Sequence, residues 1–193
     1  MNTPAHVIVN ALVLGRGEWR GLWRPITIGA VAPDVPLVAF FVYERFICSV
    51  PDEVIWSQTY FTPHWQAVFD TSHSLPLLAG AACVAYAARA RGLLALFTSM
   101  ALHSIADFPL HHDDAHAHFF PLSAWKFRSP ISYWDPRHYG TLVAPLEVLL
   151  VAAGAYLLLR RPLRAWRVIG ASVLAIYAAF LSVAFFMWGS GAL

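Results

Sequence analysis

Long apolar runs with few charges constrain this chain more than any other feature of its sequence. Such runs occur at residues 26–44, 67–88, 92–110, 141–159 and 168–189. Each is long enough for a helix to cross roughly 30 Å of hydrocarbon. Charged residues make up only 12% of the chain, about half of the roughly 25% that is usual in soluble domains. We therefore expect an all-α, polytopic membrane bundle of about five transmembrane helices, in a single domain of residues 1–193.

A shorter apolar run, from Thr3 to Leu14, precedes these segments. It is too short for a full crossing, so we expect a tucked or partly inserted helix, with Thr3 as its cap and Pro4 in its first turn. No positive charge precedes this run. A cleaved signal peptide is therefore not expected, and the N-terminus should be retained.

Basic residues gather in alternate connections between the apolar runs. Nine of the 13 lysines and arginines lie in three of these connections: Arg16, Arg20, Arg24, Arg89, Arg91, Arg160, Arg161, Arg164 and Arg167. The positive-inside rule predicts that these connections are cytoplasmic and that segments 45–66 and 111–140 face outward. The lipid bilayer is thus the first expected partner. No basic tract supports binding to nucleic acid.

Several ionisable side chains lie in or beside the apolar runs, where each costs on the order of 2.5 to 3.5 kcal/mol to insert. They are His6, Asp34, Asp70, His73, His103, Asp107 and Glu147. Asp70 and His73 are three residues apart and His103 and Asp107 four apart, so each pair occupies one helix face. We expect these groups to converge on one cavity from the outward half of the bundle. Glu147 is interpreted as the partner of an arginine or as a supporting group.

Imidazole and carboxylate donors together favour a divalent-metal site, with zinc as first choice and manganese, iron or nickel as alternatives. The two cysteines lie elsewhere and have no metal-binding spacing. Purely structural explanations stay open for each candidate. His103 and Asp107 can form a buried ion pair, His6 can be a satisfied core histidine, and Asp34 can cap a broken helix between two prolines.

The segment 111–140 differs from the rest of the chain in composition. It holds five of the nine histidines, together with three prolines and seven aromatic residues, and it cannot form a spanning helix. One interpretation is an interfacial loop with its aromatic rings at headgroup level. Its run HHDDAHAH also has a metal-binding composition, although such tracts often bind metal adventitiously. No phosphate-binding loop, dinucleotide fingerprint or GxSxG elbow supports nucleotide binding or a serine hydrolase.

A set of short motifs resembles the bacterial inner-membrane metal-dependent hydrolase family related to YdjM. They are TPAH near the start, PD after a short apolar run, HS in the middle and HxxxD before an aromatic, proline-rich stretch, all within about the first 110 residues. The matching residues are His6, Pro33, Asp34, His73, Ser74, His103 and Asp107. The family pattern usually has HR, two residues and then THS. Here VFDTSHS lacks the first histidine and the arginine, so either Asp70 substitutes or the site is altered.

The strings DFPLHHDD, HFFPL and SPISYWD are similar to a branch of this family that is sometimes labelled cobalamin biosynthesis protein (cobyric acid synthase). That label is not supported, because the chain has neither a nucleotide loop nor an amidotransferase domain. The resemblance implies a multi-pass protein of the bacterial inner (plasma) membrane. It also implies a metal site made from His6, Asp34, His73, His103 and Asp107.

Three functional hypotheses follow from these residues. The preferred one is a hydrolase of a phosphoester, ester or amide at the outer leaflet, acting on a lipid or envelope substrate. In it, Asp70 is the general base, and His111 and His112 steady the leaving group. The second is a divalent-metal transporter or scaffold without turnover, because intramembrane acids and histidines also mark ion pathways. The third is a structural membrane subunit.

Overall fold

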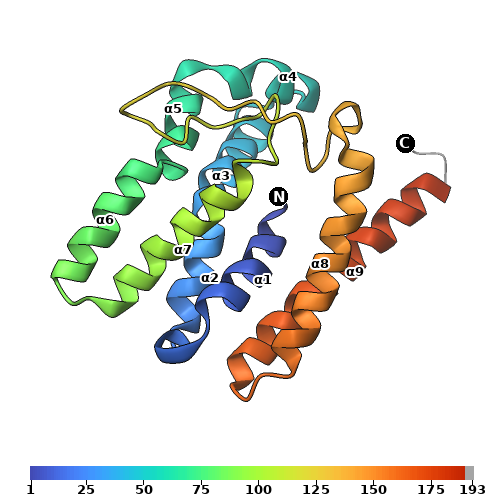
Figure 1. Cartoon of the computed structure of the whole chain (residues 1–193). Coiled ribbons are helices and arrows are strands. Elements are labelled where there is room, and N and C mark those ends of the chain that lie inside the picture. The colour runs from blue at the N-terminus through green and yellow to red at the C-terminus, as the bar shows by residue number, and fades with distance from the viewer. Residues whose placement is uncertain (190–193) are drawn as a thin grey trace.

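The computed structural model describes residues 1–189, and this part of the chain contains helices, turns and loops but no strand. Six helices lie side by side in a bundle (Figure 1). Their spatial order is α6 (Leu75–Ala87), α7 (Arg91–Asp107), α2 (Trp23–Val31), α1 (Thr3–Leu14), α8 (Gly140–Leu159) and α9 (Arg164–Gly189). The all-helical class expected from the sequence is confirmed.

Three of the described helical segments are long and apolar enough to cross a membrane: Trp23–Ile47, Gly140–Leu159 and Arg164–Val183. The first is a 25-residue segment that runs through α2, a tight turn at Ala32–Asp34, α3 (Val35–Val42) and a π-helical turn at Tyr43–Ile47. The number is smaller than the five helices expected. Two of the predicted spans account for the difference.

The apolar run 67–88 is not one helix. It is divided between α5 (Pro63–Ser72) and α6, because Ser74 caps α6 by accepting a hydrogen bond from the backbone N–H of Leu77 at 3.2 Å. The other run, 92–110, forms α7, which ends at Asp107 after 17 residues. Hydropathy averaged over a long window does not reveal either helix end, because single polar residues are outweighed by their apolar neighbours.

The short helix α1 lies at the centre of the bundle, where it contacts α2, α7, α8 and α9. Gly154 of α8 allows the close approach of α1, since a Cβ atom at this position would lie 2.3 Å from Cγ2 of Ile8. On the other side, the side-chain amide of Asn10 donates to the backbone carbonyl and the hydroxyl of Ser99, at 2.7 and 2.8 Å. These contacts confirm that the short apolar segment Thr3–Leu14 is tucked into the protein.

The carboxyl end of α1 needs partners because the last carbonyl groups of a helix have none within the helix. The guanidinium group of Arg161 supplies them. Its Nη1 atom donates to the carbonyl oxygens of Ala11 and Gly15, at 3.0 and 2.7 Å. An arginine of the α8–α9 connection therefore closes the end of α1.

The amino end of α1 is held by Glu147 of α8. The backbone and side-chain N–H groups of Asn2 donate to the two carboxylate oxygens of Glu147, at 3.0 and 2.6 Å. Tyr177 of α9 donates to the same carboxylate at 2.6 Å. Glu147 is therefore a supporting group. Thr3 does not cap α1 as expected, because it lies within the helix and its hydroxyl donates to Asp34.

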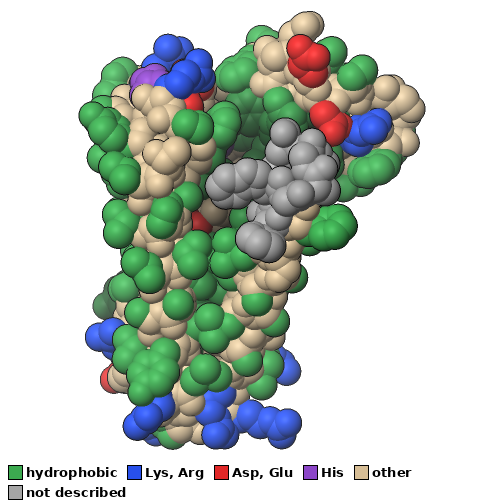
Figure 2. All heavy atoms as spheres, turned by 90° about the vertical axis from the view of Figure 1, so that its right-hand side faces the viewer, with side chains coloured by type: hydrophobic (Ala, Val, Ile, Leu, Met, Phe, Trp, Pro, Cys, Tyr) green, Lys and Arg blue, Asp and Glu red, His purple; other side chains and the backbone are tan. Residues whose placement is uncertain are grey.

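The two ends of the bundle differ in charge. The connections α1–α2, α6–α7 and α8–α9 lie at one end (Figure 1), and basic side chains gather there in the space-filling view (Figure 2). Five of the nine arginines singled out above lie in these connections, and the other four, Arg24, Arg91, Arg164 and Arg167, lie in the first turns of the helices that follow. The opposite end is formed by α4 (Asp52–Ser57), α5 and the outer loop, residues 108–139.

A compact turn around Asp135 leads from the outer loop into α8. The Asp135 carboxylate accepts hydrogen bonds from the backbone N–H and the guanidinium group of Arg137, at 2.9 and 3.0 Å, and lies 2.9 Å from Nδ1 of His138. Gly140 begins α8 directly against this turn, where a Cβ atom would lie 2.7 Å from the Asp135 carbonyl carbon. The loop therefore ends in a defined structure.

We expect Gly154→Ala to destabilise the protein by about 1–3 kcal/mol, because the added methyl group collides with Ile8 in a closely packed contact. Thermal unfolding in detergent, followed by circular dichroism, measures the effect. Gly80→Ala is the matched control in α6, since nothing lies within 4 Å of the Cβ position there. Unfolding temperatures that fall equally in the two variants would contradict this account of the α1–α8 contact.

We expect Asp135→Asn to lower the unfolding temperature at neutral pH, because Arg137 and His138 hold the pKa of Asp135 below its usual range. A lowered pKa stabilises the fold above the unfolded-state pKa of about 3.9, and the contribution is lost as the pH falls below it. The difference between variant and wild type should therefore shrink in acid. A difference that stays constant between pH 7 and pH 3 would show that these ion pairs contribute nothing.

Candidate metal centre

Four polar side chains from three parts of the chain meet near the outer end of the bundle. Asp34 closes the turn between α2 and α3, His73 ends α5, and His103 and Asp107 lie in the last turns of α7. Each offers a ligand atom, and these four atoms all lie within 4.8 Å of one another. We call these four residues the metal cluster. They are four of the five residues that the sequence predicted as metal ligands.

Most of the distances within the metal cluster are longer than those of a hydrogen-bonded network. Nε2 of His103 lies 3.0 Å from Oδ2 of Asp107 and 3.4 Å from Oδ1 of Asp34. Nε2 of His73 lies 3.8 Å from Asp34 and 4.0 Å from Asp107. Both Nε2 atoms are buried, and neither makes a hydrogen bond of acceptable geometry.

The backbone fixes the orientation of both imidazole rings. Nδ1 of His73 lies 2.9 Å from the carbonyl oxygen of Phe69, and Nδ1 of His103 lies 2.8 Å from that of Ala30. A carbonyl oxygen only accepts, so each Nδ1 carries a hydrogen and Nε2 of each ring is left to face the carboxylates. Two imidazole nitrogens and two carboxylates that face one another can hold a cation between them. The residues present therefore fit a divalent metal ion such as zinc, manganese, iron or nickel.

Only one member of the metal cluster is accessible. The side chains of His73, His103 and Asp107 are at most 3% exposed, whereas that of Asp34 is 17% exposed. Asp34 therefore marks the partly exposed side of the metal cluster.

His6, the fifth predicted ligand, lies beside the metal cluster and not within it. Its Nε2 atom is 2.9 Å from Oδ1 of Asp107, and its ring stacks on His103 with 3.6 Å between the centroids. His6 therefore faces Oδ1 of Asp107, whereas His103 faces Oδ2.

The three residues predicted to be catalytic occupy different places. Nε2 of His111 lies 3.3 Å from Oδ1 of Asp107, adjacent to the metal cluster. The described contacts of His112 are all within the outer loop, where its ring stacks on His138 with 3.6 Å between centroids. Oδ1 of Asp70 accepts a hydrogen bond from the backbone N–H of Ala117 at 2.8 Å.

Asp70 also lies 3.5 Å from Nζ of Lys126 and 4.0 Å from Nδ1 of His116. Its carboxylate therefore fastens the outer loop to α5. Its expected role as a general base stays a prediction.

Two buried histidines of the outer loop were not singled out by the sequence. The ring of His116 stacks on that of His73 with 4.0 Å between centroids, and His118 lies 6.5 Å from the same ring. Burial holds the pKa of His116 well below its usual value and lowers the pKa of His118 to about 4, so both are neutral at neutral pH. Their only signal in the sequence is the HxH spacing within HHDDAHAH.

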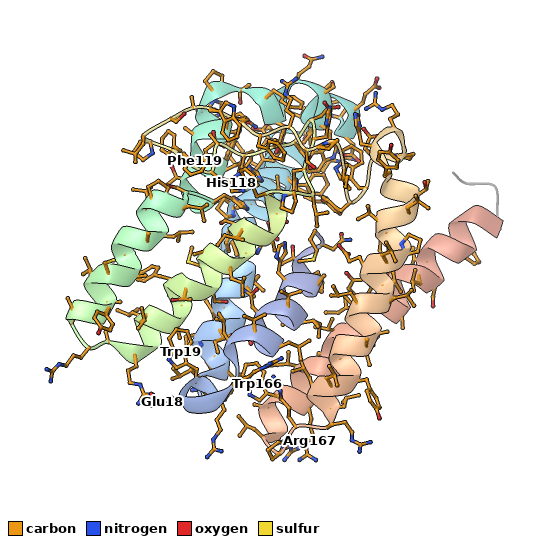
Figure 3. The ribbon with its side chains drawn as sticks, in the orientation of Figure 1. Glu18, Trp19, His118, Phe119, Trp166 and Arg167 are labelled. Carbon is orange, nitrogen blue, oxygen red and sulfur yellow. The ribbon has the colours of Figure 1, made fainter. Side chains whose placement is uncertain are left out.

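The outer loop is tied down where it passes over the junction of α5 and α6. The backbone N–H of Leu75 donates to the carbonyl oxygen of His118 at 2.8 Å, and the hydroxyl of Ser74 donates to that of Phe120. Figure 3 shows His118 and Phe119 at the end of the molecule opposite to Trp166 and Arg167. The loop thus forms a fixed cover that brings its histidines to His73.

No protein-family model matches this chain, and neither a curated protein nor a solved structure is significantly similar to it.

Loss of a residue that only supports a metal ligand typically weakens metal binding roughly 10- to 100-fold. We expect His103→Ala to weaken the binding of zinc or manganese by more than that. The reason is that His103 offers a ligand atom directly to the metal cluster. Calorimetric titration of the purified protein in detergent measures the affinity. His64→Ala is the matched control, since His64 is exposed and lies outside the cluster. Unchanged affinity in His103→Ala would exclude the metal cluster as the binding site.

Proposed function

We propose that this protein is a metal-dependent hydrolase of the bacterial inner membrane, acting on a phosphoester, ester or amide at the outer leaflet. The observation that carries the proposal is the metal cluster, in which two buried imidazole nitrogens without a hydrogen bond and two carboxylates offer ligand atoms within 4.8 Å of one another. A divalent ion bound there supplies a Lewis acid, which lowers the pKa of water and polarises a phosphoryl or carbonyl oxygen. The number of protein ligands bears on which metal ion suits this site.

An ion held by all four residues would have no free position in a tetrahedral site and two in an octahedral one, so manganese or iron would suit turnover here better than zinc. The partial exposure of Asp34 provides the side from which substrate approaches.

The protein's own groups supply proton transfer and exclude bulk water. His116 and His118 are buried beside His73, and the unpartnered ring nitrogen of His118, Nε2, can accept a proton or a hydrogen bond, because its Nδ1 donates to the carbonyl oxygen of His116. His111 lies close enough to steady a leaving group. Asp70 remains the proposed general base, and its contacts with Ala117 and Lys126 hold it in place.

A membrane location is supported by apolar side chains that face outward along the bundle. Besides the three helices that are long enough to span, α6 exposes Val84 and Tyr86 by more than 70%, and α7 exposes Leu93 and Ile105 by more than 50%. Such surfaces are unusual in soluble domains. We therefore place α6 and α7 in the bilayer as well, with the outer loop at the surface where a lipid or envelope substrate is met.

A divalent-metal transporter or scaffold is the second candidate, favoured by the burial of the metal cluster among apolar helices. The two functions predict different results in proteoliposomes. The hydrolase turns over lipid phosphoesters or generic ester probes when manganese or zinc is added. Metal flux without any hydrolysis would instead support the transporter.

We expect Asp70→Asn to keep the fold and the bound metal but to lower turnover at least about 100-fold, because an amide cannot take up a proton. Lys126→Met is the matched control, since it removes the cationic partner and leaves the Asp70 carboxylate intact. Its turnover should stay within a few-fold of wild type. Equal losses in both variants would mean that Asp70 only anchors the outer loop.

A further inference from the structure

A groove opens between the first turns of α2 and α7, at the basic end of the bundle. Its volume is about 440 Å³, which is within the roughly 300–1,000 Å³ of sites that hold small ligands. Deeper in the bundle the two helices pack closely, since a Cβ atom at Gly29 of α2 would lie 2.7 Å from Cβ of Ser99 in α7. The groove is therefore confined to the basic end. We call it the arginine groove.

The mouth of the arginine groove is positively charged, because Arg24 of α2 and Arg91 of α7 both line it. The guanidinium group of Arg24 lies over the Trp23 ring, 5.1 Å from the centroid, and it forms no ion pair with a carboxylate of residues 1–189. Nη2 of Arg91 lies 3.3 Å from Oε2 of Glu18, and both side chains of this pair are more than 60% exposed. Such an exposed pair contributes little stability, so another anion can take the place of Glu18.

The inner part of the arginine groove is apolar. Ile28 lies four residues beyond Arg24, and Leu96 lies five residues beyond Arg91. At 1.5 Å per residue, these side chains lie about 6 and 7.5 Å further along their helices than the arginines. Ile28 and Leu93 are 58% and 51% exposed. The lining thus changes from cationic to apolar in the direction of the bilayer, as a phospholipid changes from phosphate to acyl chain.

A second groove, beside this one, has a different charge balance. It is lined by Glu18 together with Arg89 and Arg91. A carboxylate among the arginines offsets their charge, so an anion is less favoured there. The arginine groove has no acidic residue in its lining. The charge of the lining therefore singles out the arginine groove.

The surroundings also favour a negatively charged lipid. Segments 16–24, 89–91 and 160–167 together hold nine arginines and one acidic residue, and basic side chains gather at this end of the molecule (Figure 2). The positive-inside rule assigns such an end to the cytoplasmic leaflet, which contains anionic lipids. Basic pockets between membrane helices on this side bind acidic headgroups.

We propose that an anionic phospholipid binds in the arginine groove, with its phosphate between the guanidinium groups of Arg24 and Arg91 and one acyl chain along the apolar residues. The proposal depends on the proposed membrane location, but not on the metal cluster or on hydrolysis. The opposing view is that anionic lipids are attracted to the whole basic end without occupying a defined site.

Native mass spectrometry of the full chain in detergent separates the two views by counting bound lipids during a titration. The wild type should bind one phosphatidylglycerol at least about tenfold more tightly than phosphatidylcholine with the same acyl chains. Replacing both groove arginines, Arg24→Gln with Arg91→Gln, should weaken this binding about 30-fold, since each arginine near an anionic lipid is worth roughly fivefold.

Arg164→Gln with Arg167→Gln is the matched control for this pair. It removes the same charge from the same end of the bundle, but neither residue lines the arginine groove. Its affinity for phosphatidylglycerol should stay within about threefold of wild type, because charges outside the site are screened by salt.

A further variant tests the shape of the groove and keeps both arginines. Gly92 lines the groove, and a Cβ atom there would meet nothing within 4 Å. Gly92→Leu therefore fills part of the groove without displacing a neighbour, and it should weaken phosphatidylglycerol binding at least about tenfold. Gly80→Leu in α6 is the matched control, since its Cβ position is equally open. Circular dichroism checks that each variant keeps its helices.

The outcomes distinguish this proposal from the proposed function. Equal losses in the two arginine pairs, or unchanged binding in Gly92→Leu, would overturn the defined site and leave only a general attraction. A wild-type chain without a preference for phosphatidylglycerol would also overturn it, even if metal-dependent hydrolysis were found. A preference that depends on the groove, in a chain that binds no metal, would support the lipid site and end the hydrolase proposal.

Discussion

The buried carboxylate of Asp107 is the interaction on which the rest of this structure depends. An ionised carboxylate that is 2% exposed needs hydrogen-bond donors or cations around both of its oxygens. Those neighbours come from four directions: α1 supplies His6, the end of α5 supplies His73, α7 supplies His103, and the outer loop supplies His111. Satisfying this one charge therefore requires α1, α5 and the loop to converge on the last turn of α7.

The position of α1 shows how the bundle meets this requirement. A short helix leaves unsatisfied backbone groups at both ends. Arg161 satisfies carbonyl groups at one end, and Glu147, held by Tyr177, binds the backbone at the other. With both ends fixed, His6 is brought to Asp107 and Thr3 to Asp34. The contacts of α1 with α8 and α9 thus support the metal cluster from a distance.

The outer loop has a similar role on the other side. Its backbone is bound to the α5–α6 junction through Leu75, Ser74 and Asp70, and this places His116 against His73. The junction is a break in a longer apolar run, and the break is what turns His73 towards the metal cluster. A continuous spanning helix would have given the loop no free N–H group at Leu75 to bind. The helix break at Ser74, which divides the predicted span 67–88, therefore also positions His73 in the metal cluster.

The sequence by itself determined the helical class, the central tucked helix, the gathering of arginines at one end and the shared helix face of His103 and Asp107. These properties depend on hydropathy, charge and helical spacing, which act over a few residues. The resemblance to a known family also predicted that Asp34 and His73 join that pair. The tertiary structure alone decided that His6 lies beside the metal cluster and that His116 and His118 are buried next to it. It also decided that Asp70 faces the loop and that Asp107 has two occupied sides. These contacts join residues far apart in the chain, and their formation depends on packing between helices, which no local pattern encodes.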